Sequence, residues 1–222
     1  MTETADLNRT RETRAQVRVL RMLSALSAAG VEEVGVQEFH AFAFFTEVLA
    51  PVWGLDSPTG DILKEEGGPH YPMLQSALDR LVGLGLVRVA RLTGDDRGGR
   101  WRLDVAFAIR AQAAAPVIAL LDDMPDEDPA MVEFLEQLAF SFADIPADRR
   151  DDAALVDALW SAAGYDENRL IEFAGDRDGR TARNYSADAA RRFQRFAPSD
   201  VNLSPAEQTS LYMSLMRRRA SA

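Results

Sequence analysis

The chain has 222 residues, of which 47% are hydrophobic, and a formal net charge of −10. This length suits one large domain or two small ones with a hydrophobic core. There is no cysteine, which excludes disulfides, thiolate catalysis and cysteine-ligated zinc or iron–sulfur centres. The amino terminus lacks the apolar core of a signal peptide, and no apolar run reaches the roughly 18 residues of a membrane span. We therefore expect a cytoplasmic protein.

The negative charge is unevenly distributed along the chain. Residues 111–222 hold 12 basic and 20 acidic side chains, so this half carries −8 of the net −10. Nonspecific affinity for DNA comes mostly from cationic side chains that displace counterions from phosphates. A chain with this balance is repelled by phosphate backbones, so we expect any contact with DNA to be local and modest.

Two helices are predicted near the start. In "RETRAQVRVLRMLSALSAAG" apolar residues recur at the helical spacing i, i+3, i+4 and i+7, and Gly30 is placed to end the helix. A second helix is expected from about Val36 until Pro51 ends it. A helix that is apolar on two sides is buried between layers or against a partner. One apolar side of this helix carries Phe39, Phe42, Phe45 and Leu49, and the opposite side carries Phe44 and Val48.

A loop, a third helix and a hairpin are predicted next. Residues 54–70 are rich in glycine and proline and predict a loop, after which Pro72 fits the first position of a helix that Gly83 ends. Alternating apolar residues in "LVRVARL" and "WRLDVAFAI" predict two strands, joined by the turn residues "TGDDRGG". This is the element order of a winged helix-turn-helix, in which the third helix usually reads the major groove and the hairpin is the wing.

Beyond Ala111 the patterns are helical. Asp128 is the expected N-cap of one helix, and Ser204 and Glu207 form a predicted capping box at the start of the last one. Helical patterns are also found in "DDAALVDALWSAAG", with a further apolar turn at "NRLIEFAG". The predicted fold class is therefore mainly α with a small β-hairpin: a winged helix-turn-helix domain at residues 1–112 and an all-helical domain at residues 113–222.

The residues needed for common enzyme chemistry are missing. The only lysine, Lys64, is not part of a phosphate loop, and Gly83 and Gly85 lie between a helix and a strand, the reverse of the dinucleotide-binding order. His40 is expected in the core, whereas for His70 an interface role and solvent exposure stay open. The acidic stretches "DDMPDEDP" and "GDRDGRTARNYSAD" are interpreted as solvated loops, because the second departs from the calcium-loop pattern. We expect no enzyme activity, cofactor or metal.

Arginines concentrate around the hairpin, where three aspartates reduce the local charge to 5 − 3 = +2. Arginines on a wing can hold phosphates or enter a minor groove. The third helix adds Gln75 and Arg80 beside Asp79, a thin set for base recognition. With so little positive charge, the same unit fits a protein-docking module, which is the preferred interpretation. The candidate DNA contacts are Arg88, Arg91, Arg97, Arg100 and Arg102 of the hairpin with Gln75 and Arg80.

A resemblance to a known family covers roughly residues 15–110. "RVLRMLSALSAAG", the phenylalanine-rich helix ending in "LAPVWGL", and "LKEEGGPHYPMLQSALDRLVGLGLVRV" together resemble the middle component of the ABC three-component bacterial defence systems, which include Lamassu-type anti-phage operons. The resemblance implies a winged-helix accessory subunit without catalysis of its own. It also implies two partners, an SMC-like coiled-coil ABC ATPase and an effector, often a nuclease.

The family resemblance implies that apolar side chains not needed for the core form an interface with another protein. We expect a protein interface formed by Phe44, Val48, Trp53, Tyr71, Leu211, Tyr212, Leu215 and Met216, although the last four are also able to close the core of the helical domain. The expected function is that of a noncatalytic accessory subunit that bridges ATPase and effector, with weak nonspecific DNA contact. The alternatives are a winged-helix transcriptional regulator with a helical dimerisation or sensing domain, and a metal-dependent enzyme that uses the "DDMPDEDP" carboxylates.

Overall fold

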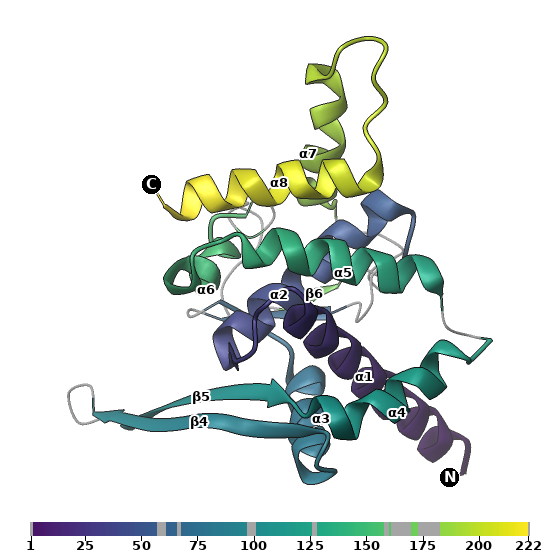
Figure 1. Cartoon of the computed structure of the whole chain (residues 1–222), viewed down its shortest axis with the longest axis vertical. Coiled ribbons are helices and arrows are strands. Elements are labelled where there is room, and N and C mark those ends of the chain that lie inside the picture. The colour runs from purple at the N-terminus through teal and green to yellow at the C-terminus, as the bar shows by residue number, and fades with distance from the viewer. Residues whose placement is uncertain are drawn as a thin grey trace. The chain divides into compact units, whose positions relative to one another are not determined.

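The computed structural model (Figure 1) describes residues 2–56, 61–65, 68–96, 101–125, 128–157, 160, 170–172 and 183–221. The chain is mainly helical with small antiparallel sheets. It forms two compact units: Met1–Val36 with Tyr71–Glu127 is unit 1, and Gln37–His70 with Asp128–Ala222 is unit 2. This differs from the predicted division between residues 112 and 113, because the chain crosses between the units more than once.

Unit 1 contains α1 (Thr2–Ala28), β1 (Val34–Gly35), α3 (Pro72–Gly83), β4 (Val87–Asp96), β5 (Trp101–Ile109) and α4 (Ala111–Asp122). Helix α1 packs against α3, α4 and β5. Its predicted apolar face is buried, with Val19, Met22 and Leu26 fully enclosed. Gly30 adopts φ 86°, the left-handed conformation that glycine allows just past a helix end, so the predicted stop is confirmed.

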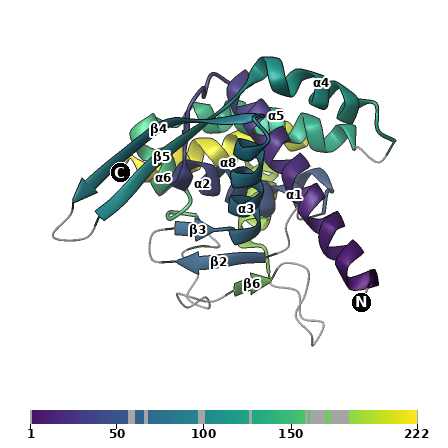
Figure 2. The same ribbon diagram turned by 90° about the horizontal axis from the view of Figure 1, so that it is seen from below.

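The sheet of unit 1 has the strand order β1–β5–β4, and its strands are antiparallel. Figure 2 shows β4 and β5 as a long two-stranded ribbon, which confirms the predicted hairpin. The register slips between Val89 and Arg91, where β4 carries an extra residue. Such a bulge shifts the alternation of side chains between the two faces of a sheet by one position.

Unit 2 is built around a helix that is buried beyond its first turn. Every residue of α2 (Val36–Leu49) from Phe39 onward is buried. The Phe42 ring lies 5.3 Å from that of Phe142, and the Phe44 ring lies 5.8 Å from Trp160, each distance joining ring centroids. The expectation that this helix is enclosed on both apolar sides is confirmed. The other elements are η1 (Ala50–Trp53), β2 (Asp61–Glu65), β3 (Gly68–His70), α5 (Pro129–Ala143), η2 (Ala147–Arg149), α6 (Arg150–Ala153), β6 (Leu170–Glu172), α7 (Tyr185–Arg192), η3 (Phe193–Phe196) and α8 (Pro205–Ala220).

A second sheet, with strand order β3–β2–β6, corrects two predictions (Figure 2). The predicted loop at 54–70 contains β2 and β3, which pair with each other. The apolar turn expected at "NRLIEFAG" contains strand β6, in which Leu170 pairs with Leu63 of β2. The pairing of β2 with β6 joins segments more than 100 residues apart, so no local pattern predicts it, whereas β2 and β3 form a local pair that the glycine- and proline-rich composition concealed. The helix predicted in "DDAALVDALWSAAG" is limited, among described residues, to α6 and the turn after it.

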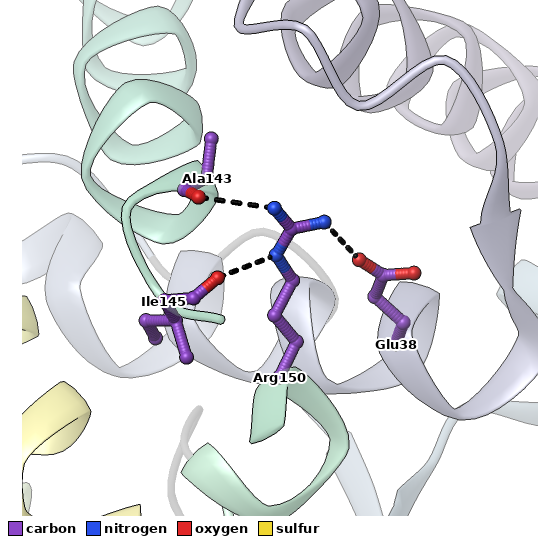
Figure 3. Close-up of polar contacts among 4 residues, drawn as sticks. All are labelled: Glu38, Ala143, Ile145 and Arg150. Carbon is purple, nitrogen blue, oxygen red and sulfur yellow. Dashed lines mark hydrogen bonds and ion pairs between the residues drawn. The ribbon is translucent and has the colours of Figure 1, made fainter. Parts of the chain in front are cut away.

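Arg150 links three parts of unit 2 (Figure 3). Its guanidinium donates to Glu38 Oε1 of α2 at 2.8 Å, and the side chains of this ion pair are only 13% and 12% exposed. It also donates to the carbonyl of Ala143 at the end of α5 and to the carbonyl of Ile145, both at 3.0 Å. One side chain thus neutralises a nearly buried carboxylate and satisfies two carbonyls that the helix end leaves open.

A buried carboxylate joins α7 and α8. Asp157 is fully buried and accepts hydrogen bonds from Ser186 Oγ of α7 and from Tyr212 Oη of α8, both at 2.6 Å. The backbone N–H of Trp160 donates to the same carboxylate at 3.4 Å. A buried charge needs such donors, because removing it from water is costly unless hydrogen bonds replace the hydration.

The predicted caps are confirmed. Asp128 accepts from the backbone N–H of Ala130 at the start of α5. At the start of α8 the Ser204 backbone N–H donates to Glu207 Oε2 at 2.7 Å, and the Ser204 hydroxyl donates to the same atom at 2.8 Å. The Glu207 backbone N–H in turn donates to Ser204 Oγ at 3.2 Å. These hydrogen bonds, first that of the Ser204 backbone and then that of its hydroxyl, lower the pKa of Glu207 from its ordinary value of 4.5.

Replacing Glu207 by glutamine is expected to reduce the pH dependence of stability in the acid range. Because the pKa of Glu207 is lower in the folded chain, its stabilisation is present above the unfolded value of 4.5 and is lost as the pH falls through the folded value. Urea unfolding between about pH 6 and about pH 3 measures this. The difference in unfolding free energy between the wild type and Glu207→Gln should shrink as the pH falls. A difference that stays constant would contradict the expectation.

Candidate nucleic-acid and protein interfaces

The polar face of the hairpin carries the arginines that the structure describes. Arg88 pairs with Ala108, and Arg91 pairs with Ala106, two residues further along β5. The bulge therefore brings both arginines to one face, although their spacing of three would place them on opposite faces of a regular strand. Both are exposed, and Arg91 Nε lies 3.5 Å from Asp104 Oδ2. The backbone of Arg102 pairs with Asp95, whereas Arg97 and Arg100 lie outside the described residues.

Helix α3 offers few free polar groups for DNA. Gln75 Nε2 donates to Asp79 Oδ1 at 2.9 Å, so this amide is engaged within its own helix. Arg80 is 65% exposed, and its guanidinium lies 4.0 Å from the Glu12 carboxylate of α1. An exposed pair at that distance is weak and screened by salt. Both candidate residues are thus placed on the surface of unit 1, but each lies beside a carboxylate that reduces its attraction for phosphate.

The opposite face of the hairpin is apolar, and this apolar surface extends past the part that α1 and α3 cover. Val87 and Phe107 are buried at its base, whereas Val89, Leu92 and Leu103 further out are exposed. Sequence alternation shows that this face is apolar but not how much of it is covered. The length of the strands indicates this exposed part. Strands of 10 and 9 residues are longer than the 12-residue helix α3, because a strand rises further per residue than a helix does.

Several predicted interface residues are enclosed within the chain, which corrects the expectation for them. Phe44, Val48 and Tyr71 are buried, and so are Tyr212 and Met216. Phe44 packs on Trp160, and Tyr212 donates to Asp157, so these side chains serve the core of unit 2. The reason is the second layer of helices, which the sequence did not place against α2.

The remaining interface candidates differ in exposure. Trp53 is half-buried and donates from Nε1 to Thr209 Oγ1 at 3.0 Å, and its ring lies 5.7 Å from that of Phe134. Leu215 is half-buried and Leu211 is exposed. Of the eight residues, Leu211 therefore retains the accessibility that a docking surface needs.

The two histidines of the chain lie close to each other in unit 2. His40 is buried as expected, and its ring centroid lies 4.7 Å from that of His70, which is half-buried in β3. The described ranges contain no group of three or more histidine, aspartate or glutamate side chains arranged to hold a metal ion. The acidic stretches were expected to be loops: in the first, Asp128 caps α5, and most of the second lies outside the described residues.

None of the helices in the described part of the chain is long and apolar enough to cross a membrane. Comparison of the chain with protein-family models, with curated proteins and with solved structures found no match. In unit 1, the feature that most directly suggests a ligand is the presence of Arg88 and Arg91 on the same face of the hairpin.

Proposed function

We propose that this protein is a noncatalytic accessory subunit of an anti-phage defence complex, with a winged-helix unit that contacts DNA weakly. The observation that carries the winged helix is the sheet order β1–β5–β4 in unit 1, with α1 packed against α3 and β5 and with α3 packed against β4. The exposed Arg88 and Arg91 on one face of that hairpin support a contact with phosphates.

The proposed DNA contact is sequence-independent. The amide of Gln75 is bound to Asp79, and Arg80 is close to Glu12, so α3 presents little for reading bases. A chain of net charge −10 binds DNA poorly on its own. A partner that already holds DNA raises the effective concentration at the hairpin, so that a weak contact is sufficient. The proposed partners are a coiled-coil SMC-like ABC ATPase and an effector, as the family resemblance suggests.

Purification of the tagged protein expressed with its neighbouring genes tests the proposed assembly. The expected result is a complex whose mass includes a large coiled-coil ATPase. Recovery of a free two-fold dimer that binds its own promoter fragment would instead favour a winged-helix transcriptional regulator, which has two equivalent reading helices.

The double variant Arg88→Ala/Arg91→Ala is expected to weaken binding of the assembled complex to duplex DNA and to lower its salt dependence. Each lost phosphate contact lowers the slope of log affinity against log salt by about 1. Binding measured over a range of salt concentrations gives that slope. The control is Arg217→Ala/Arg218→Ala on α8, which removes equal charge from unit 2. Equal losses for both variants would show that only total charge matters and would contradict a contact at the hairpin.

A further inference from the structure

Unit 2 contains a cluster of arginines that neither the hairpin nor the core explains. A hollow of about 310 Å³ on α7 and η3 is lined by Arg183, Asp188, Arg191, Arg192 and Arg195. Four arginines against one aspartate give a local charge of +3, in a chain whose net charge is −10. In Figure 1 this segment extends beyond α8 at the top of the view. Because the chain as a whole is negative, a local cluster of cationic side chains indicates a place where binding of an anion is favoured.

Two of these arginines are held by the protein itself. Arg183 Nε lies 3.0 Å from Asp188 Oδ2, and its guanidinium lies 5.3 Å from the centre of the Tyr185 ring. Arg191 donates to the backbone carbonyl of Pro51. These contacts fix the position of one edge of the cluster while leaving part of each guanidinium available.

The other two arginines have no such role. Arg192 and Arg195 are exposed, and neither forms an ion pair or a side-chain hydrogen bond with any described residue. Arg192 is the N-cap of η3, whose geometry brings side chains three positions apart onto one edge. Arg192 and Arg195 therefore lie on the same edge of the segment, where none of the described residues neutralises them.

An exposed aromatic side chain lies next to them. Phe196 directly follows Arg195 and is 84% exposed, the largest fraction among the exposed large apolar side chains of the described residues. Tyr185 of α7 is 40% exposed, with one guanidinium already over its ring. The exposed ring beside exposed arginines offers a flat apolar surface to a ligand that also carries negative charge.

The chemistry of the cluster narrows the class of ligand. Small organic ligands prefer enclosed, mostly apolar pockets, whereas this hollow is lined by exposed charged side chains. The guanidinium fork matches phosphate oxygens in geometry. Aromatic rings stack on bases, but the bases of a duplex are stacked on one another and are not accessible in this way. Arginines interleaved with exposed aromatics are the arrangement that single strands use.

We propose that the α7–η3 segment binds single-stranded nucleic acid, with Arg192 and Arg195 on the phosphates and Phe196 stacked on a base. This site lies in unit 2 and does not depend on the assembly or the hairpin contact proposed above. Asp188 limits its strength, because it neutralises Arg183 and lies at the same hollow.

Fluorescence anisotropy with a labelled oligothymidine of about 20 nucleotides, using the full chain at low salt, tests this site. Arg192→Glu/Arg195→Glu is expected to weaken binding about 10-fold or more. The matched control Arg11→Glu/Arg14→Glu reverses two exposed arginines of α1 and should change the affinity by about 2-fold at most. Phe196→Ala is expected to weaken binding about 5-fold without changing the salt dependence, because it removes stacking and no charge.

Several results would overturn the proposal. If Arg192→Glu/Arg195→Glu and Arg11→Glu/Arg14→Glu weakened oligothymidine binding equally, the affinity would depend only on the net charge of the chain. Base stacking would be excluded if a duplex of the same length bound as tightly as the single strand. An affinity for oligothymidine that is unchanged in Phe196→Ala would exclude it as well. Polyglutamate that competes as well as unlabelled oligothymidine would make the cluster a site for acidic peptides. Absence of oligothymidine binding at low salt would also refute it.

Discussion

Replacing Arg150 by alanine is expected to lower the free energy of unfolding by about 3 kcal/mol, because it removes the guanidinium that pairs with the nearly buried carboxylate of Glu38. Glu38 is only 12% exposed, and the guanidinium of Arg150 donates to it at 2.8 Å. The same substitution removes the donors to the carbonyls of Ala143 and Ile145. Urea unfolding monitored by circular dichroism measures the loss.

Arg149→Ala is the matched control. This neighbouring arginine is 50% exposed and lies 3.6 Å from Asp148 and 3.9 Å from Asp152, a geometry in which an ion pair contributes about 0 to 1 kcal/mol. Changing both partners, as in Arg150→Met/Glu38→Leu, should recover much of the loss, since no unpaired charge then stays buried. Equal costs for Arg149→Ala and Arg150→Ala would contradict the role given to the Glu38 pair.

The second large effect is expected at Asp157. Replacing it by alanine removes the acceptor that serves Ser186 Oγ and Tyr212 Oη, both in fully buried side chains. A buried donor deprived of its acceptor costs about 1 to 3 kcal/mol, so the two together predict a loss of about 4 kcal/mol. Thermal and urea unfolding measure it.

Tyr212→Phe separates the contributions within this network. It removes one hydrogen bond to a charged acceptor and is expected to cost about 2 kcal/mol, less than the loss of the carboxylate itself. Asp152→Ala is the control, because that carboxylate is 52% exposed. If Asp157→Ala were no more destabilising than Asp152→Ala, the carboxylate would have no part in holding α7 and α8.

The elements that the sequence predicted well are those with local signals. The starts of α5 and α8 depend on Asp128 and on the pair Ser204 and Glu207, whose partners lie within three residues. The hairpin depends on alternation within each strand. The burial of α2 followed from its two apolar sides, although its partners Phe142 and Trp160 were not identified.

The elements that the sequence missed depend on distant partners. Strand β2 lies in a stretch rich in turn residues, and it becomes the central strand of a sheet because β6, more than 100 residues away, pairs with its other edge through Leu170 and Leu63. The interface assigned to Phe44 and Val48 failed for the same reason, because helical spacing shows that a face is apolar but not which segment covers it. The division into units follows such contacts rather than any linker composition.

The candidate site was predicted in part. Alternation placed Arg88 away from the apolar face, but only the bulge after Val89 explains why Arg91 joins it. The arginines of α7 and η3, in "ARRFQRFAP", were not among the predicted site residues. Their significance comes from Arg183 and Asp188, which the fold brings to the same hollow.

The alternation of the chain between its two units has a consequence for synthesis on the ribosome. Phe142 is made 100 residues after its partner Phe42. At typical elongation rates that interval lasts roughly 5 to 20 s. Throughout it the nascent chain displays a helix that is apolar on two sides and lacks the ring of Phe142 that packs on it. Chaperone supply and growth temperature are therefore expected to govern the soluble yield, and any truncation before α5 leaves α2 permanently without Phe142 and Trp160.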